Sequence, residues 1–207
     1  MNIFQQHSRK LLLAFLLMLL TLGLLQQTSY AKTSFSKSYK YYEIGGTTIE
    51  DFWRNVALYG PRANRKFGVV GLTTFKLDIP YRYSNKNGKC QLTSVEIKLR
   101  STISLPKWVD KSRSDKDMRI FWKALSGDVK RHEEKHVSIA ESSFKALEMA
   151  ILNIKPQRNC KALKKKINAL SKQSERARNR AQNNFERDEI RGQKKRLSGL
   201  IELLRSN

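Results

Sequence analysis

The stretch His132-Glu133-Glu134-Lys135-His136 lies in the middle of the long amphipathic segment that decides the fold of this chain. Residues four apart lie on one face of a helix, so the two imidazoles converge on one point while Glu133 sits beside them. Zinc favours such a pair of neutral nitrogens, and it lowers the pKa of a bound water to roughly 7, so that a neighbouring glutamate can act as general base. The spacing therefore predicts Zn as cofactor, His132 and His136 as metal ligands, and Glu133 as the catalytic base of a hydrolase.

The residues around this pattern predict one long helical region. Ser114 and Asp117 form a capping box at its start, and Lys155-Pro156 stops it near residue 154. Gly127 is expected to bend or divide the helix. Apolar residues recur at helical spacing, and we expect the two histidines to continue this core-facing stripe, where a metal satisfies them better than they satisfy each other. The stripe consists of Met118, Phe121 or Trp122, Leu125, Val129, Ile139 or Ala140, Leu147 and Ile151.

The residues before the long helix predict strands, which makes the fold class α+β. Residues 32–38 are polar and are expected to form a flexible lead-in. The expected elements are a short strand over 39–43, a helix over 49–57 capped by Thr47 or Thr48, and two strands over 69–83 and 92–105. Asn87-Gly88 suits a tight hairpin turn between those two strands. We therefore expect N-terminal antiparallel strands packed on long helices, with the histidine pattern on a zincin-like active-site helix.

The C-terminal part of the chain is strongly basic. The whole chain has a formal net charge of +23, and residues 158–207 hold fifteen Lys and Arg against five Asp and Glu. A last helix is expected over 160–187, followed by a basic helical tail over 193–207. Anionic envelope polymers or lipid headgroups are the expected partners of this surface, and a solvated face without a dedicated ligand is the alternative. Nucleic acid is not expected as a partner, because no recognition motif is present.

The third zinc ligand is expected to be a carboxylate, because the one further histidine lies in the N-terminal segment. Glu141 lies nine residues after His132, which places it on the opposite side of the helix. Glu186 is preferred, because zinc hydrolases with two histidines and one glutamate commonly bring the glutamate from a later helix. Glu148 and Asp188 are lesser candidates, and a surface ion pair is the alternative role of Glu186.

The N-terminus has the three parts of a secretory signal peptide. Arg9 and Lys10 precede an apolar run over residues 11–25, and Ser29-Tyr30-Ala31 offers small side chains at the two positions that signal peptidase reads. The apolar run is shorter than the ~20 residues of a spanning helix. We therefore expect cleavage after Ala31 and a periplasmic or secreted mature chain without a transmembrane span. An uncleaved anchor is the alternative.

The two cysteines of the chain are Cys90 and Cys160. In an exported protein an even pair is most simply a disulfide, which would tie the strand region to the end of the long helix. The alternative is that a sulfur binds zinc, although thiolate ligands are commoner in closed structural sites than in hydrolytic ones.

Several segments resemble one family of bacterial secreted proteins. They are Tyr41-Tyr42-Glu43-Ile44-Gly45-Gly46, Gly60-Pro61, Cys90, Leu105-Pro106-Lys107-Trp108 and the pattern at 132–136. Together they resemble the domain of unknown function 922 family, described as predicted zinc-dependent proteases. The resemblance spans about residues 39–192. It implies a secreted, zinc-dependent, protease-like protein. Together with the signal peptide expected over 1–31, this gives a zinc-protease-like domain over 32–192.

The chain departs from this family in a later motif. The family has Tyr-Asp, two residues, Thr, one residue and His-Gly, where this chain has Phe185-Glu186-Arg187-Asp188-Glu189-Ile190-Arg191-Gly192. Arg191 takes the place of the histidine. Arginine stays protonated and cannot bind zinc, but it can stabilise an oxyanion, so Arg191 is a candidate for that role.

Two functions from different classes follow from these features. The first is an exported zinc metallopeptidase or amidase that cleaves a protein or peptide substrate with Glu133 as general base. The second is a non-catalytic, strongly basic envelope protein that binds anionic polymers on a degenerate zincin fold, and the departure at Arg191 favours it.

Overall fold

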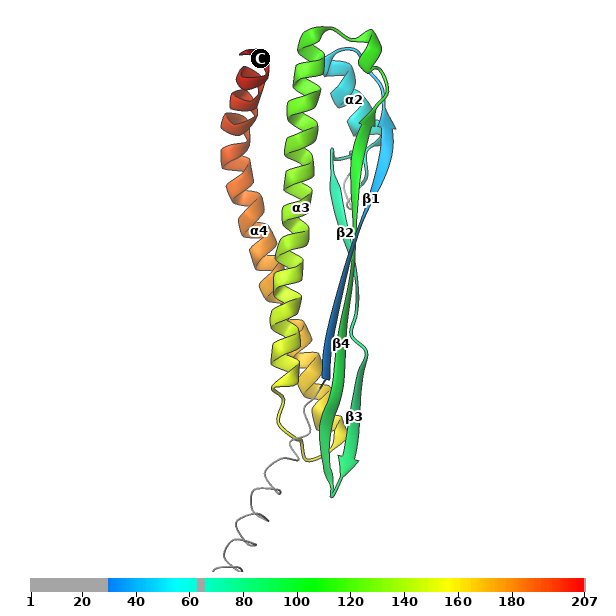
Figure 1. Cartoon of the computed structure of the whole chain (residues 1–207), viewed down its shortest axis with the longest axis vertical. Coiled ribbons are helices and arrows are strands. Elements are labelled where there is room, and N and C mark those ends of the chain that lie inside the picture. The colour runs from blue at the N-terminus through cyan, green and yellow to red at the C-terminus, as the bar shows by residue number, and fades with distance from the viewer. Residues whose placement is uncertain (1–29, 63–65, 207) are drawn as a thin grey trace, which may run out of the picture.

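The computed structural model describes residues 30–62 and 66–206, and these residues form an elongated α+β fold in three layers (Figure 1). A sheet of long strands lies on one side of helix α3 (Lys116–Leu152), and helix α4 (Cys160–Ser206) lies on the other. The predicted α+β class is therefore confirmed. Most of the predicted signal peptide, including its apolar run, lies outside the described residues. Within the described residues, no helix has the length and apolar character needed to cross a membrane.

Strand β4 (Lys89–Trp108) is the axis of the sheet. Strand β1 (Tyr30–Ile44) runs parallel to it along one side, while β2 (Leu72–Asp78) and β3 (Tyr81–Lys86) pair with it antiparallel on the other. The sheet is mixed, so the prediction of purely antiparallel strands is wrong. A parallel pair needs a crossover connection, and here the chain between β1 and β4 supplies it with α2 (Ile49–Tyr59), β2 and β3.

Strand β1 begins well before the predicted short strand. Residues 32–38 pair with residues 96–102 of β4, so the prediction of a flexible lead-in is wrong. Their backbone groups are satisfied by a long partner strand, so polar side chains do not prevent them from forming a strand. Periodicity within 32–38 alone carries no sign of that partner.

The predicted strand over 69–83 is divided into β2 and β3. Pro80 lies at the break, where it has no amide hydrogen to donate to the ladder, although its carbonyl accepts a hydrogen bond from the Glu96 amide at 2.9 Å. The hairpin turn between β3 and β4 is confirmed. Asn87 and Gly88 have φ values of 50° and 71°, which a type I′ turn requires at both central positions.

Helix α2 confirms the prediction made for 49–57 and adds one more half turn. The Thr48 hydroxyl caps it by accepting a hydrogen bond from the Asp51 amide at 3.1 Å. Phe52 and Val56 are buried from its inner face, so α2 covers the end of the sheet where β4 finishes.

Helix α3 is one continuous element of 37 residues, and two local predictions for it are wrong. Its N-cap is Asp115, which accepts from the Met118 amide at 2.7 Å, while the Ser114 hydroxyl donates to the Asp110 carbonyl at 3.0 Å. Gly127 neither ends nor divides the helix. A helical glycine costs only about 1 kcal/mol relative to alanine, which is little beside the packing of α3 on both sides.

Helix α4 runs antiparallel to α3 for 47 residues, well beyond the predicted end at 187, so residues 193–206 continue this helix. Only Leu163 and Ile167 among its residues are buried, because just its first turns reach the sheet. From there on, polar contacts with α3 and a few partly buried side chains, among them Phe185 and Ile201, hold it. These contacts place specific side chains of α4 beside the histidines of α3.

Two clusters of buried side chains fill the space between α3 and the sheet. One joins the first half of β4 to the second half of α3 and the start of α4, and the other joins the second half of β4 to α2 and the first half of α3. The predicted disulfide between Cys90 and Cys160 closes the first cluster. The histidines lie on α3 where the two clusters meet.

Candidate metal centre

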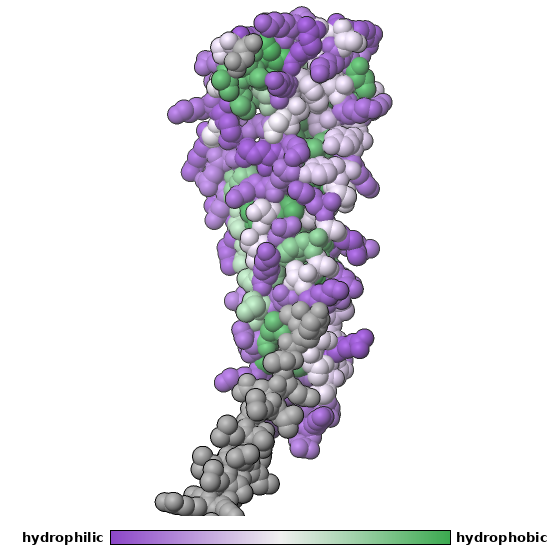
Figure 2. Space-filling view, viewed as in Figure 1, coloured by the Kyte–Doolittle hydropathy of each residue, from purple (hydrophilic) through white to green (hydrophobic). Residues whose placement is uncertain are grey.

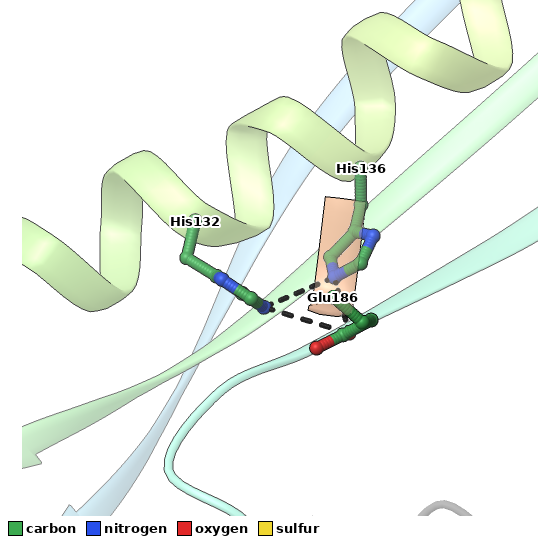
Figure 3. A group of neighbouring side chains, drawn as sticks. All are labelled: His132, His136 and Glu186. Carbon is green, nitrogen blue, oxygen red and sulfur yellow. Dashed lines mark hydrogen bonds and ion pairs between the residues drawn. The ribbon is translucent and has the colours of Figure 1, made fainter. Parts of the chain in front are cut away.

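His132 and His136 project from α3 toward α4, where Glu186 meets them (Figure 3). The two Nε2 atoms are 3.1 Å apart, and Glu186 Oε1 lies 3.7 Å from Nε2 of His132 and 3.0 Å from Nε2 of His136. These three side chains are the one group in the described part of the chain that can offer three ligand atoms to a single metal ion. The structure thus brings together the three residues that the sequence predicts as ligands.

The distances between these atoms suit a tetrahedral ion. With metal–ligand bonds of about 2.0–2.1 Å, two ligands of a tetrahedral Zn²⁺ lie about 3.3 Å apart. The three observed separations, 3.0, 3.1 and 3.7 Å, bracket that value. A ligand set of two imidazoles and one carboxylate leaves a fourth position open, as catalytic zinc sites do.

The partners of the other ring nitrogens determine which histidine nitrogens carry protons. Gln182 Nε2 donates to the His136 carbonyl at 3.0 Å, so the Gln182 oxygen faces Nδ1 of His136 at 2.5 Å and requires a hydrogen there. Nδ1 of His132 lies 3.4 Å from the Glu189 carboxylate, which likewise requires a donor. In the neutral imidazoles both Nε2 atoms are therefore lone-pair acceptors.

In this arrangement three acceptor atoms, Nε2 of His132, Nε2 of His136 and Oε1 of Glu186, direct their lone pairs toward one another. Two unprotonated Nε2 atoms and a carboxylate oxygen lie close together without a hydrogen between them, which is unfavourable unless a cation occupies the space. A shared proton or a metal ion meets that need. The Nδ1 partners are also those that usually orient metal-binding histidines, a carboxylate on one ring and an amide oxygen on the other. The residues therefore fit a zinc ion.

Phe185 holds the two imidazoles in place. Its ring centroid lies 5.0 Å from that of His132 and 5.1 Å from that of His136, so one aromatic side chain of α4 packs against both rings. The histidine side chains are 23% and 14% exposed, while that of Glu186 is 47% exposed. The two imidazoles are thus packed against Phe185, and the ligand group is accessible to solvent on the side of Glu186.

The histidines do not continue the sheet-facing stripe of α3, contrary to the prediction. Glu133 and Val137 do so instead, because the stripe passes from Val129 through these positions to Ala140. An interior helix with a sheet on one side and a helix on the other has two buried faces, and helical spacing alone does not say which residues take which face. The metal ligands take the face toward α4.

Glu133 lies between α3 and the start of β2. Its carboxylate accepts a hydrogen bond from the Thr73 hydroxyl at 2.7 Å, and the residue is only 5% exposed. A Cβ atom on Gly71, just before β2, would lie 2.7 Å from Glu133 Oε1 and 2.8 Å from Val129 Cγ1, so any side chain there would have to displace one of them. Glu133 lines a pocket of about 220 Å³ together with His132 and Glu186. A buried carboxylate therefore faces the same space as the candidate ligands.

Glu134, the other acid of the pattern, points toward β1. It is bound by Lys130 at 2.8 Å, by Lys37 at 3.3 Å and by the Tyr39 hydroxyl. The hydrogen bonds from Lys130 and Tyr39 lower the pKa of Glu134 to about 2. This carboxylate is a permanent anion that ties α3 to the sheet, so the two glutamates of the pattern have different surroundings.

Behind His132, two arginines and two acids join α3 to α4. Arg131 and Arg196 both donate to Asp128 and to Glu189, and Glu189 in turn accepts from His132. Burial raises the pKa of Asp128 and of Glu189, but the hydrogen bonds from the arginines outweigh it, so both pKa values lie below their ordinary range. Both acids stay ionised at neutral pH, which keeps an acceptor in place behind His132.

Replacing Asp128 with asparagine is expected to destabilise the protein by about 2 kcal/mol at pH 7, because an amide cannot accept from both arginines and would turn a donor toward one of them. The lowered pKa in the folded state gives a stabilisation that is present above the unfolded pKa of about 3.9 and is lost as the pH falls through the folded value. Urea unfolding at pH 7 and pH 3 measures the difference.

Asp117→Asn is the matched control for Asp128→Asn. Its side chain is 72% exposed and pairs with Arg205 at 3.3 Å, so its loss is expected to change the stability hardly at all. A loss as large for Asp117→Asn as for Asp128→Asn, or a loss for Asp128→Asn that does not shrink at pH 3, would contradict the role of this buried ion cluster.

The other residues considered from the sequence lie away from the metal centre. The Arg191 side chain is 79% exposed and pairs with Asp188 at 4.0 Å, so the geometry lends no support to an oxyanion role. Asp188, Glu141 and Glu148 are absent from the group of candidate ligands formed by the described residues.

Gln182 and Glu189 are functional candidates that sequence reasoning missed. With Glu186 they are spaced four and three residues apart, which is one face of α4. That spacing was readable in the sequence, but nothing in the sequence indicates that this face of α4 lies against the histidines. The contacts themselves come from the antiparallel register of α3 and α4.

Comparison with known proteins shows the family of this chain. The model of a family described as bacterial protein of unknown function, DUF922, matches residues 39–192, which include β2 to β4, all of α3 and the ligand-bearing part of α4. No curated protein matches the chain significantly, and neither does any solved structure. The match covers most of the chain, and its extent agrees with the segments that resemble this family. The chain belongs to the DUF922 family of bacterial proteins.

Proposed function

We propose that this protein is an exported zinc-dependent hydrolase of the peptidase type. The observation that carries the proposal is the convergence of His132, His136 and Glu186, whose three acceptor atoms lie together with both Nδ1 atoms held by acceptors of α4. A bound Zn²⁺ would supply a Lewis acid there and lower the pKa of water, which is the chemistry that hydrolysis at neutral pH needs.

The residues of this chain have distinct roles in the proposal. His132, His136 and Glu186 would hold the ion, while Glu189 and Gln182 orient the imidazoles. Glu133 takes a proton from the attacking water and returns it to the leaving amine, and the Thr73 hydroxyl holds its carboxylate in the pocket. Glu134 is unsuited to this role, because three donors already bind it.

The position of β2 favours an extended peptide as substrate. β2 pairs with β4 along one side, and among the described strands none pairs along its other side. Its Thr73 contacts Glu133, and the adjacent residues Val70 and Gly71 line the pocket. A peptide added to this free edge by main-chain hydrogen bonds would bring a carbonyl toward the pocket.

Export is part of the proposal, and the disulfide supports it. Disulfides persist in oxidising compartments such as the periplasm, and Cys90 and Cys160 are bonded in this fold. The predicted signal peptide and the absence of further cysteines agree with this location. The mature protein would be periplasmic or secreted.

Hydrolysis of an unfolded protein substrate by the zinc-loaded protein, followed by peptide mapping, tests the proposal. Glu133→Gln is expected to lower kcat/KM by about 10²- to 10⁴-fold and to leave the zinc content unchanged, because the side chain moves the proton but does not bind the metal. Glu141→Gln on the same helix is the control, and it is expected to retain activity.

The outcomes separate the two candidate functions. Zinc at one equivalent without any hydrolysis would favour the alternative, a non-catalytic envelope protein whose metal joins α3 to α4. The excess of cations over residues 158–207, fifteen Lys and Arg against five Asp and Glu, favours that alternative as a binder of anionic polymers. Protein without zinc affinity would exclude the zinc hydrolase altogether.

A further inference from the structure

A second pocket lies at the far end of the molecule, where α3 begins and α4 ends. Its volume is about 490 Å³, and it lies between the first three turns of α3, the 3-10 helix η1 (Lys111–Arg113) and the last turn of α4. Lys123, its nearest cation to the metal centre along α3, precedes His132 by nine residues, which is about 13 Å along the helix axis. The pocket is therefore separate from the metal centre.

Four cations line this pocket, and no carboxylate does. They are Lys111, Lys116, Arg119 and Lys123. Within the described residues the side-chain ammonium groups of the three lysines have no hydrogen bond or ion pair, while Arg119 donates to the Ser114 carbonyl. The nearest carboxylates along the chain are engaged elsewhere: Asp110 by Arg113, Asp115 by the Met118 amide, and Asp117 by Arg205. The pocket is thus a concave site that four cations line and no carboxylate enters.

The wall of the pocket also has an apolar part. Trp122, Ile120 and Leu204 lie among the cations, and Trp122 is braced from behind by Trp108, with ring centroids 5.8 Å apart. At this end of the molecule, Figure 2 shows hydrophobic side chains of the C-terminal part of α4 bordered by hydrophilic ones. Val109, just before η1, is 49% exposed. A ligand that combines an anion with apolar groups matches this lining better than a bare ion does.

We propose that this pocket binds the phosphate group of an anionic phospholipid, so that the end of the molecule formed by η1, the start of α3 and the end of α4 docks on a membrane surface. Lysine and arginine side chains bind phosphate oxygens as charge-assisted donors. The apolar wall contacts the glycerol and acyl region beside the phosphate. A free phosphate or pyrophosphate is the other source of the same chemistry, and the experiment distinguishes the two.

Co-sedimentation of the full chain with vesicles tests this proposal. Vesicles contain phosphatidylglycerol in phosphatidylcholine, and pure phosphatidylcholine vesicles give the baseline. The variant Lys111→Gln/Lys116→Gln/Lys123→Gln is expected to bind the anionic vesicles on the order of 100-fold more weakly, since each lysine near an anionic surface changes partitioning about fivefold. All three side chains are exposed, so the fold is expected to be retained, and circular dichroism checks this.

The control variant lowers the net charge by the same three units at a place far from the pocket. Lys165→Gln/Lys166→Gln/Lys172→Gln removes three exposed lysines of α4 far from the pocket, and it is expected to weaken binding no more than about fivefold. Equal losses in both triple variants would overturn the pocket in favour of general attraction by a basic protein. Calorimetric binding of pyrophosphate without any preference for anionic vesicles would overturn the lipid assignment and identify a soluble phosphate.

Discussion

Glu186→Gln is expected to lower the affinity of the protein for Zn²⁺ on the order of 1,000-fold, and His136→Ala is expected to do at least as much. Each change removes one of three ligands, and the neutral amide of glutamine is a poor substitute for a carboxylate. Glu189→Gln and Gln182→Ala are expected to lower the affinity only about 10- to 100-fold, because these residues orient the imidazoles without binding the ion.

Competition with a chromophoric chelator measures these affinities, and elemental analysis after dialysis gives the zinc content of each variant. Asp188→Asn is the matched control for Glu186→Gln. Its side chain is 76% exposed and lies two residues further along α4, so its loss is expected to leave the affinity unchanged. Equal affinities for Glu186→Gln and Asp188→Asn would show that Glu186 is not a ligand, and full zinc content in His136→Ala would show that the ion binds elsewhere.

Loss of the disulfide is expected to cost about 4 kcal/mol of stability. The bond joins residues 70 apart in the sequence, so removing it frees a long loop in the unfolded chain, and the chain-entropy relation gives this value. The variant Cys90→Ala/Cys160→Ala is expected to unfold at a urea concentration lower by about 2 M, for an unfolding slope near 2 kcal/mol/M. Urea titration of the oxidised protein and the double variant tests this.

Both sulfurs close the cluster that holds the first half of β4 against α3 and α4. The first turns of α4, with Leu163 and Ile167, are its only buried part, so we expect the disulfide to matter most for the attachment of α4. Hydrogen exchange is therefore expected to rise first in α4 when the bond is reduced. A double variant as stable as the oxidised protein, or one whose exchange rises evenly over the whole fold, would contradict this view.

Features with a local cause could be predicted from the sequence. The spacing of His132 and His136 places two imidazoles on one face of any helix, and Thr48 and Asn87-Gly88 have side chains or backbone preferences that determine a cap and a turn within a few residues. The disulfide followed from the presence of only two cysteines. In the first three cases the deciding interaction joins residues only a few positions apart. In the last case, two cysteines allow only one disulfide.

Features that depend on a distant partner could not be predicted in this way. Residues 32–38 form a strand because β4 lies beside them, and α3 continues through Gly127 because packing on both sides outweighs the local cost of glycine. The same is true of Glu133. Its position four residues after Val129 and four before Val137 suits the sheet-facing stripe as well as the histidines do, and the sheet decides between them.

The sequence by itself determined which chemical groups form the candidate site. These are two imidazoles and a glutamate on one helix, with a few carboxylates as candidates for the third ligand. Only the tertiary structure decided that Glu186 meets the histidines, that Gln182 and Glu189 hold their other nitrogens, and that Arg191 faces solvent. The physical reason is that helical periodicity fixes neighbours within a helix, whereas the contacts between α3 and α4 depend on the register in which two long helices pack.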